Sequence, residues 1–480
     1  MTTNSYYATV ASILSEMPIM EMNPVTVVLG VIVILLVLFL LAMAYAVYTH
    51  RTPKHVDIKA LKALQVPKDS LFRIFQPHLV PMDEISARGY SSVLAIVQEC
   101  IGVQPTCDTV LEIWKPAFQC YNLIVPHFLN LPELLLPGYD LVDLVPLSMY
   151  VSSRANECTY CTSHCCSFAM RRGVDPATLR NSLEAILNKD AATKVTPAER
   201  AVIRVSYGLG TVPACLNKED VRLLQETLKK PGQEEWIVAA AAMFGAFNKY
   251  MDGLAIPLEA DAYGETMEHI DPKFVPSKSA TLGLALNDPK AALPVPPKDD
   301  WTLQLAIIYQ GLRPGGAASL DSKLAKGVPT KVEDCIAFLK DLTGATFPVL
   351  RKLQHARLRR ALTAILSKNF VSDGIALSTK VLAGIQYCGQ LQNEQLKSEL
   401  QQVLASEVED KYSKSNNNKA LLLKAAKALS YNPSRMTESI IDEIEASSIT
   451  AENMVELVSF LAALQALHRF EIYFQVAEEN

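Results

Sequence analysis

The sequence predicts an all-α protein in which one apolar helix precedes two related helical domains. Leu and Ala recur at three- and four-residue spacing, for example over 237–247 and 455–467, and this is the period of an amphipathic helix. Segments with strand-like alternation are hard to find. Half of the residues are hydrophobic and a fifth are charged, as in globular domains. The formal net charge of −5 gives no basic excess that would favour nucleic-acid binding.

The first element is an uncharged apolar run that begins at Val25 and ends at Val47. Its length suits a bilayer-spanning helix, which we place at 25–48 behind a short tail over 1–24. A secretory signal peptide is the alternative, but it would have a shorter apolar core and a basic region before it. We therefore expect a retained membrane anchor.

The charged residues on either side of this run predict its orientation. Only Glu16 and Glu21 precede it, whereas a basic juxtamembrane linker over 49–67 follows. That linker contains Arg51, Lys54, Lys59 and Lys62 against the single acid Asp57. Lys and Arg favour the cytosolic side of a membrane, so we expect the tail outside and the large C-terminal portion facing the cytosol. A reducing cytosol would keep the ten cysteines as free thiols.

The rest of the chain divides by composition. Residues 256–300 are rich in Pro and polar residues and have little helical periodicity, which indicates a linker or extended arm. We expect one helical domain over 68–255 and a second over 301–480.

The stretch from Cys158 to Cys166 gathers two thiols three residues apart, an imidazole at His164 and two further thiols. Asn156 is a plausible N-cap, and Gly173 stands where a left-handed C-terminal residue belongs, so the stretch predicts one helix. The first turn of such a helix stabilises a thiolate, and we expect it to lower the pKa of Cys158. Arg154 acts in the same direction and the carboxylate of Glu157 in the opposite one, and the sequence does not decide between them.

Helical spacing places Cys158, Cys161 and Cys165 on one face. His164 lies one turn beyond Cys161 and could exchange a proton with it. The same residues could instead bind a structural zinc, or they could be inert buried thiols, which suits Cys165 and Cys166 better than the first pair. We interpret the remaining cysteines mainly as core residues, namely Cys100, Cys107, Cys120, Cys215, Cys335 and Cys388.

At this stretch the chain resembles the alkylhydroperoxidase D and carboxymuconolactone decarboxylase family, an all-α group. Its redox members carry C-x-x-C followed closely by His at the start of a helix. The resemblance covers residues 110–260. Its further matches are Tyr160, Ala169, Gly173, 196–201, Pro213, Asp220, Val221, Phe244, Phe247 and Asn248.

The resemblance implies a role for each residue of the motif. Cys161 would attack a peroxide, Cys158 would resolve the resulting sulfenic acid as a disulfide, and His164 would belong to a proton relay with a carboxylate. The family places that carboxylate, a Glu, about three turns before the first Cys, where this chain has Pro146. Asp143, one turn further upstream, is our candidate for the relay.

The motif departs from the family at one more point. The His follows the second Cys by four residues in the family, but that position is Cys165 here and His164 stands one residue earlier. Either position is one turn from Cys161, so the relay survives geometrically.

A weak internal similarity predicts a duplication with one active and one inactive copy. The matched pairs are Tyr387-Cys388 with Tyr160-Cys161, Pro433 with Pro213, and 466–470 with 246–250. The positions that match Cys158 and His164 are apolar in the second copy, where they are Ile385 and Leu391. The second copy therefore lacks the dithiol cycle, and we expect it to complete a pseudo-symmetric dimer with the first.

These patterns together predict a membrane-anchored thiol peroxidase or disulfide reductase with no metal or organic cofactor. Its substrate would be a small peroxide or disulfide. Reduction of the disulfide needs an external dithiol, and the resemblance suggests a thioredoxin-like or lipoyl one. A homo-oligomer is a further expectation, because family members commonly form multimers. Two other classes stay open. A non-redox decarboxylase-like enzyme would retain activity in Cys161→Ser, and a membrane-tethered helical scaffold with a structural zinc would carry stoichiometric metal.

Overall fold

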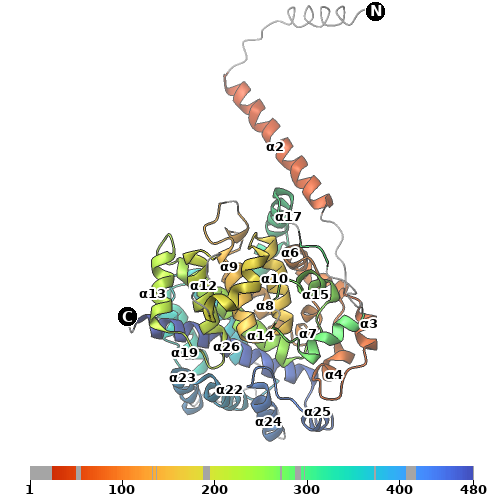
Figure 1. The fold of residues 1–480 in the computed structure, drawn as a ribbon, viewed down its shortest axis with the longest axis vertical. Helices are drawn as coiled ribbons and strands as arrows, with labels where there is room; N and C mark the ends of the chain where they lie inside the picture. Colours follow the sequence, from red (N-terminus) through yellow and green to blue (C-terminus); the bar gives the residue numbers. More distant parts are fainter. Residues whose placement is uncertain are drawn as a thin grey trace, which may run out of the picture.

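The computed structural model describes residues 24–49, 56–131, 133–136, 138–187, 195–270, 273–286, 293–296, 298–371, 374–406 and 418–478. Every regular element within these ranges is helical, which confirms the all-α class. Figure 1 shows one long helix that projects from a body of packed helices. Nearly all of the predicted tail and the basic residues Arg51 and Lys54 lie outside the described ranges.

The helices up to the centre of the chain are α2 (Pro24–Thr49), α3 (Ile58–Ala63), α4 (Phe72–Phe75), η1 (Gln76–His78), α5 (Met82–Ile85), η2 (Ser86–Tyr90), α6 (Ser91–Ile101), α7 (Cys107–Leu111), α8 (Lys115–Phe128), η3 (Glu133–Leu135), α9 (Leu144–Ala155), α10 (Thr159–Arg171), α11 (Pro176–Leu187), α12 (Pro197–Gly210), α13 (Lys218–Thr227) and α14 (Gln233–Gly253). Three short helices follow, α15 (Ala260–Thr266), α16 (Lys278–Thr281) and η5 (Leu282–Leu286). The remaining helices are α17 (Trp301–Leu312), α18 (Ala317–Leu324), α19 (Val332–Thr343), α20 (Val349–Lys352), α21 (Ala356–Phe370), α22 (Leu377–Leu391), α23 (Glu394–Ala405), α24 (Lys419–Leu429), α25 (Glu438–Glu445) and α26 (Ala451–Glu478).

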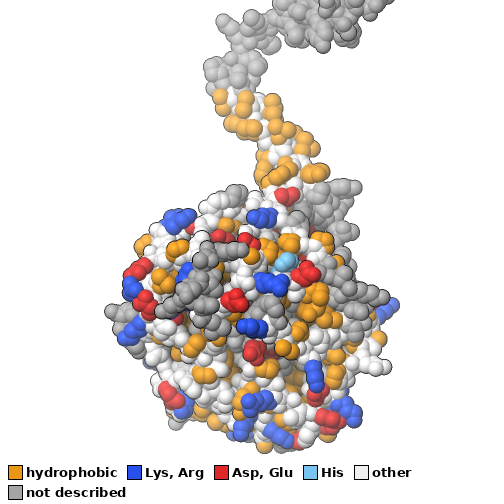
Figure 2. Space-filling model, viewed as in Figure 1, with side chains coloured by type: hydrophobic (Ala, Val, Ile, Leu, Met, Phe, Trp, Pro, Cys, Tyr) orange, Lys and Arg blue, Asp and Glu red, His pale blue; other side chains and the backbone are white. Residues whose placement is uncertain are grey.

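The projecting helix is α2, and it corresponds to the helix predicted over 25–48. Its segment Val28–Ala46 has a mean hydropathy of 3.1, so α2 is long and apolar enough to cross a membrane. Figure 2 shows hydrophobic side chains along this helix, whereas charges of both signs are spread over the body. Only the C-terminal end of α2 approaches the body, where Ala46 is buried.

The segment predicted to be a linker over 256–300 differs from that expectation. It contains α15, α16 and η5, and it folds back against the body through backbone hydrogen bonds. Leu258 N–H donates to the Ala280 carbonyl at 3.0 Å, and Leu293 N–H donates to the Gly264 carbonyl at 2.8 Å. The prolines limit each helix to a few residues, which removes the periodicity that a longer helix would show.

The centre of the body is the pair α14 and α26. Both are apolar around most of their circumference, and such helices are stable only when surrounded by others. They pack most extensively against each other. α14 also contacts α8, α9, α10 and α12, whereas α26 also contacts α20, α21, α22 and α24. We call residues 56–286 the first half and residues 332–478 the second half. α17 and α18 lie between them in sequence and pack on α6 and α8 of the first half.

Each central helix carries a buried cationic side chain that donates hydrogen bonds to the other half. Lys249 of α14 donates to the Leu429 carbonyl at 2.8 Å and the Tyr431 carbonyl at 3.3 Å, both in the second half. Arg469 of α26 donates in the opposite direction, to the Gly210 carbonyl at 3.3 Å in the first half. Burial lowers the pKa of Lys249 to about 7 and that of Arg469 to about 9. Each half therefore satisfies backbone carbonyls at the end of a helix in the other half.

A similar turn occurs once in each half. Cys215 N–H donates to the Gly208 carbonyl at 2.9 Å after α12, and Arg435 N–H donates to the Ala428 carbonyl at 2.9 Å after α24. In each case a proline lies two residues before the donor and follows a cis peptide bond. Each turn leads into a short helix and then into one of the two central helices.

Candidate functional site

The helix that carries the thiols begins later than its predicted cap. Cys158 is the N-cap of α10, and its Sγ accepts a hydrogen bond from Cys161 N–H at 3.4 Å. Asn156, which we expected to be the N-cap, instead ends α9, and its side chain donates to the Gly210 carbonyl at 3.1 Å. The reason is Glu157, whose left-handed φ of 61° separates the two helices. Gly173 has the predicted left-handed conformation, with a φ of 97°.

The two thiols of the motif are adjacent and buried. Burial is the main reason that the pKa of Cys158 is raised to about 11, although hydrogen bonds from Cys161 act in the opposite direction. Burial also raises the pKa of Cys161 well above its usual value, and Cys158 adds to the rise. The expected lowering of the Cys158 pKa is therefore corrected. The helix terminus stabilises a thiolate, but the loss of hydration outweighs it.

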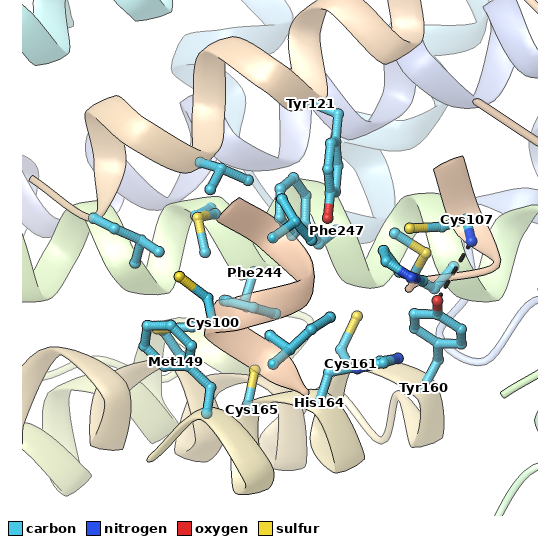
Figure 3. A pocket seen from close by; sticks show the side chains of 18 of the residues that line it. Cys100, Cys107, Tyr121, Met149, Tyr160, Cys161, His164, Cys165, Phe244 and Phe247 are labelled. Carbon is cyan, nitrogen blue, oxygen red and sulfur yellow. Dashed lines mark hydrogen bonds between the residues drawn. The ribbon is translucent and has the colours of Figure 1, made fainter. Parts of the chain in front are cut away.

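The thiol cavity, shown in Figure 3, is a narrow apolar space of about 70 Å³ between α6, α8, α10 and α14. Cys161, His164 and Cys165 form its α10 wall. The other walls include Ile96, Val97, Cys100 and Ile101 of α6, Tyr121 and Val125 of α8, and Met243, Phe244, Phe247 and Met251 of α14. Most of these side chains are hydrophobic, so the space favours an organic group over a hydrated ion.

The imidazole of His164 is oriented by a carboxylate. His164 Nε2 lies 2.8 Å from Glu259 Oε2, and Glu259 Oε1 accepts from the Tyr160 hydroxyl at 2.8 Å and from Thr106 N–H. Burial alone would raise the pKa of Glu259, but His164 and the Thr106 N–H outweigh it and hold the pKa below its ordinary value. Glu259 is therefore ionised at neutral pH.

The other ring nitrogen of His164 is available for chemistry. Nδ1 is buried and has no hydrogen-bond partner among the residues that the structure describes. In the tautomer that donates from Nε2 to Glu259, Nδ1 carries the lone pair of the ring. His164 and Cys161 both line the thiol cavity, so an imidazole base and a thiol face the same apolar space.

Glu259 is the site residue that the sequence analysis missed. It stands just before α15, in the segment predicted to be a linker, and no motif spacing relates it to the thiols. Asp143, the predicted relay residue, lies at the N-terminal end of α9. Towards its other end that helix meets the thiols, where Ser153 Oγ is 3.5 Å from Cys165 Sγ. Ten helical residues separate Asp143 from Ser153, about 15 Å. The structure therefore does not bring Asp143 to the thiols.

The two thiols have different surroundings. Cys158 lies close to Asp252 at the end of α14, and the negative charge of Asp252 adds to the rise in the Cys158 pKa. Burial raises the pKa of Asp252 to about 7, while Cys158 and Lys249 act to lower it. Asp252 lines a second pocket with Asp69, Ser277 and Ser434. Cys161 thus faces an apolar cavity, whereas Cys158 lies next to a polar one.

A third hollow lies on the far side of the relay carboxylate. Glu259 and Thr106 line it together with Gln104, Asp57 and Asp261. Because Glu259 also contacts His164, the His164–Glu259 pair connects the thiol cavity with this third hollow, whose lining includes the carboxyl groups of Asp57 and Asp261. Such an arrangement allows a proton to move between the two spaces without passing through apolar side chains.

The remaining thiols do not assemble into a metal site. Within the described ranges, no group of three or more His, Cys, Asp or Glu side chains is arranged to hold a metal ion. All ten cysteines are free, and nine are buried. Cys215 is exposed, unlike the core residue that we expected. Cys100 and Cys107 are buried as expected, but both also line the thiol cavity, which their sequence spacing did not reveal.

The second half carries its own buried thiol. Cys388 lies on α22, and burial raises its pKa, with further contributions from Glu471 and Glu399. Ile385 and Leu391, on the same helix, stand at the positions that we matched to Cys158 and His164. The second half thus has no dithiol at this helix.

Comparisons with known proteins identify no relative. No family model matches the sequence, and no curated protein or solved structure matches the chain.

Proposed function

We propose that this chain is a membrane-anchored thiol peroxidase that reduces an organic hydroperoxide. The observation that carries the proposal is the adjacent thiol pair Cys158 and Cys161 beside an apolar cavity, with His164 in the same wall and held by Glu259. Nucleophilic catalysis requires a nucleophile, a base close to it and a residue that orients the base.

The first step consumes the hydroperoxide at Cys161. His164 Nδ1 accepts the thiol proton, and the thiolate sulfur attacks the outer oxygen of the O–O bond. That bond breaks, Cys161 becomes a sulfenic acid, and the departing alkoxide takes the proton back from His164 to leave as an alcohol. Glu259 stabilises the imidazolium while it holds that proton.

The second step forms the disulfide. The Cys158 sulfur attacks the sulfenic sulfur of Cys161, and the S–O bond of the sulfenic acid breaks. Asp252, which lies close to Cys158, takes the Cys158 proton and passes it to the leaving hydroxide, which departs as water. An external dithiol of the thioredoxin or lipoyl type then supplies two electrons and restores both thiols. The polar pocket beside Cys158 is the side from which such a dithiol approaches.

The anchor and the second half complete the proposal. α2 spans the membrane, and the basic residues that follow it in the sequence place the body in the cytosol. The two halves arose by duplication, because the buried cations Lys249 and Arg469 and the matching turns keep the same order and spacing. The inactive half then provides, within one chain, the interface that a homodimer would form between two.

Peroxide treatment of the full chain tests the proposal. We expect about one equivalent of cumene hydroperoxide to remove two thiols, and peptide mapping to join Cys158 to Cys161. The rate should rise with pH between 6 and 9, by up to about tenfold per unit, because burial raises the pKa of both thiols and the thiolate is the nucleophile. Cys215→Ser, which removes an exposed thiol, should give the same result. Unchanged thiols, or a disulfide elsewhere, would refute the proposal.

The relay makes a separate prediction. Glu259→Gln should slow the first thiol oxidation by roughly 10–100-fold, because the neutral amide no longer stabilises the imidazolium of His164. Stopped-flow measurement with cumene hydroperoxide gives the rate. Glu265→Gln is the matched control, because Glu265 is also on α15 and accepts hydrogen bonds from Ser167 and Arg171, which lie further along α10 than His164. Asp143→Asn should leave the rate unchanged. If Glu259→Gln oxidises its first thiol as fast as the native protein, Glu259 does not take part in the proton relay.

A further inference from the structure

α17 presents an apolar surface that the body does not cover. No residue from Trp301 to Leu312 is charged, and one face of this helix, formed by Leu303, Ala306 and Ile307, is buried. Trp301 is 55% exposed and Leu312 is 77% exposed. Exposed apolar side chains that gather on one helix mark an interaction surface more often than isolated ones do.

Polar contacts at both ends hold α17 in place. Asp300 caps its first turn by accepting from Leu303 N–H at 3.0 Å. At the other end, Arg313 Nε donates to Ser92 Oγ at 2.8 Å, where α6 begins. Asp300 and Arg313 therefore lie at the two ends of α17, and the uncharged helix between them is about 18 Å long.

The helix next to α17 indicates that lipid covers the exposed apolar surface of α17. α17 packs against α2, the apolar helix that projects from the body (Figure 1). If α2 crosses a bilayer, a helix packed on its C-terminal part lies at the level of the lipid surface. An uncharged helix with an exposed Trp is the kind of element that settles there, because Trp favours the membrane–water interface.

α17 is also next to the thiol cavity. It packs on α6, and α6 also supplies Ile96, Val97 and Ile101 to the cavity wall. One helix thus separates the apolar surface of α17 from the space that holds Cys161. The cavity is apolar, so it suits the hydrocarbon part of a substrate as well as its peroxide group.

We propose that α17 lies in the membrane interface beside α2, and that the thiol site takes a lipid hydroperoxide from that bilayer. The proposal rests on the proposed function, since it names the substrate class of the same site. The products are the lipid alcohol, water and the disulfide between Cys158 and Cys161, which the external dithiol reduces.

The first test measures membrane contact without activity. The full chain is reconstituted in phosphatidylcholine vesicles in which some lipids carry bromine atoms near the headgroup. Trp301 is the exposed one of the three tryptophans, and Trp114 and Trp236 are buried. We expect the brominated lipid to quench part of the fluorescence in the native protein and much less in Trp301→Phe. Equal quenching in both proteins would overturn the placement of α17.

The second test compares two substrates. Vesicles contain phosphatidylcholine hydroperoxide, and tert-butyl hydroperoxide is supplied from water in parallel. The double variant Trp301→Glu and Leu312→Glu should reduce the lipid hydroperoxide at least about tenfold more slowly, because charge expels α17 from the interface. Its rate with tert-butyl hydroperoxide should stay within about twofold of the native rate.

A matched control and the opposite outcomes complete the design. Leu404→Glu places a charge at another exposed Leu, on α23 in the second half, and should change neither rate. Equal slowing with both substrates in the double variant, or no slowing with either, would overturn the lipid-substrate proposal. If the native protein reduces neither hydroperoxide, the proposed function itself fails, and quenching of Trp301 still reports separately on where α17 lies.

Discussion

Cys161→Ser is expected to slow hydroperoxide reduction by roughly 10³-fold or more, because the hydroxyl that replaces the thiol is a far weaker nucleophile toward the O–O bond. The loss should appear as an unchanged thiol count after peroxide treatment and as the absence of alcohol product. Folding should be retained, since Ser is close to Cys in size and the site already contains hydroxyl groups at Ser153 and Thr162.

Cys165→Ser is the matched control for this prediction. Cys165 is one turn further along α10, is equally buried and lines the same cavity, but its Sγ is hydrogen-bonded to the Ser153 hydroxyl at 3.5 Å. We expect it to keep most of the activity. Cys158→Ser should complete the first step and then stop, so that a sulfenic acid at Cys161 is trapped by dimedone. Full activity in Cys161→Ser would instead favour a non-redox, decarboxylase-like reaction.

Arg469→Ala should lower the free energy of unfolding by about 3–5 kcal/mol, which makes it the substitution with the largest expected effect on stability. The guanidinium is completely buried, so its removal leaves a cavity between the halves. It also removes one donor from the Ser152 hydroxyl and from the carbonyls of Ala241 and Gly210, of which the Gly210 carbonyl keeps its hydrogen bond from Asn156. Urea denaturation of the full chain measures the loss.

Two variants separate the causes of this effect. Arg469→Met fills most of the volume but donates no hydrogen bond, so a smaller loss there would assign the difference to the cavity. The lowered pKa of Arg469 shows that burying its charge is itself costly, which favours a milder effect in Arg469→Met. Lys424→Ala, which removes an exposed ion pair with Glu443, should change stability by less than about 0.5 kcal/mol. A similar small effect of Arg469→Ala would show that this buried cation does not join the halves.

The sequence predicted the helical class because helical period and apolar length are local properties. The long apolar runs that became α2, α14 and α26 are visible in the residues themselves. The C-x-x-C pair and His164 were found for the same reason, since their spacing lies within one helix. The alignment of Lys249 with Arg469 was also visible in the sequence. Their hydrogen bonds to the opposite half are known only from the structure.

The parts that were missed depend on distant contacts or on a single backbone angle. Glu259 reaches His164 because a Pro-rich segment folds back over α10, which no periodicity encodes. The pKa of Cys158 depends on how completely the body covers it, so a local argument from the helix terminus gave the wrong direction. The displaced N-cap depends on Glu157, whose side chain gives no sign of its left-handed backbone.

The carbonyl oxygen of Gly210 accepts hydrogen bonds from two side chains, Asn156 and Arg469. Asn156 ends the helix before the thiols, and Arg469 comes from the second half. The second half is thus tied, through one atom, to the bend that sets Cys158 in place. We therefore expect substitutions in the second half to be tolerated more readily on its outer surface than along its central helix. A chain truncated to the first half would lose this contact, so we do not expect the first half alone to keep the geometry around Cys158.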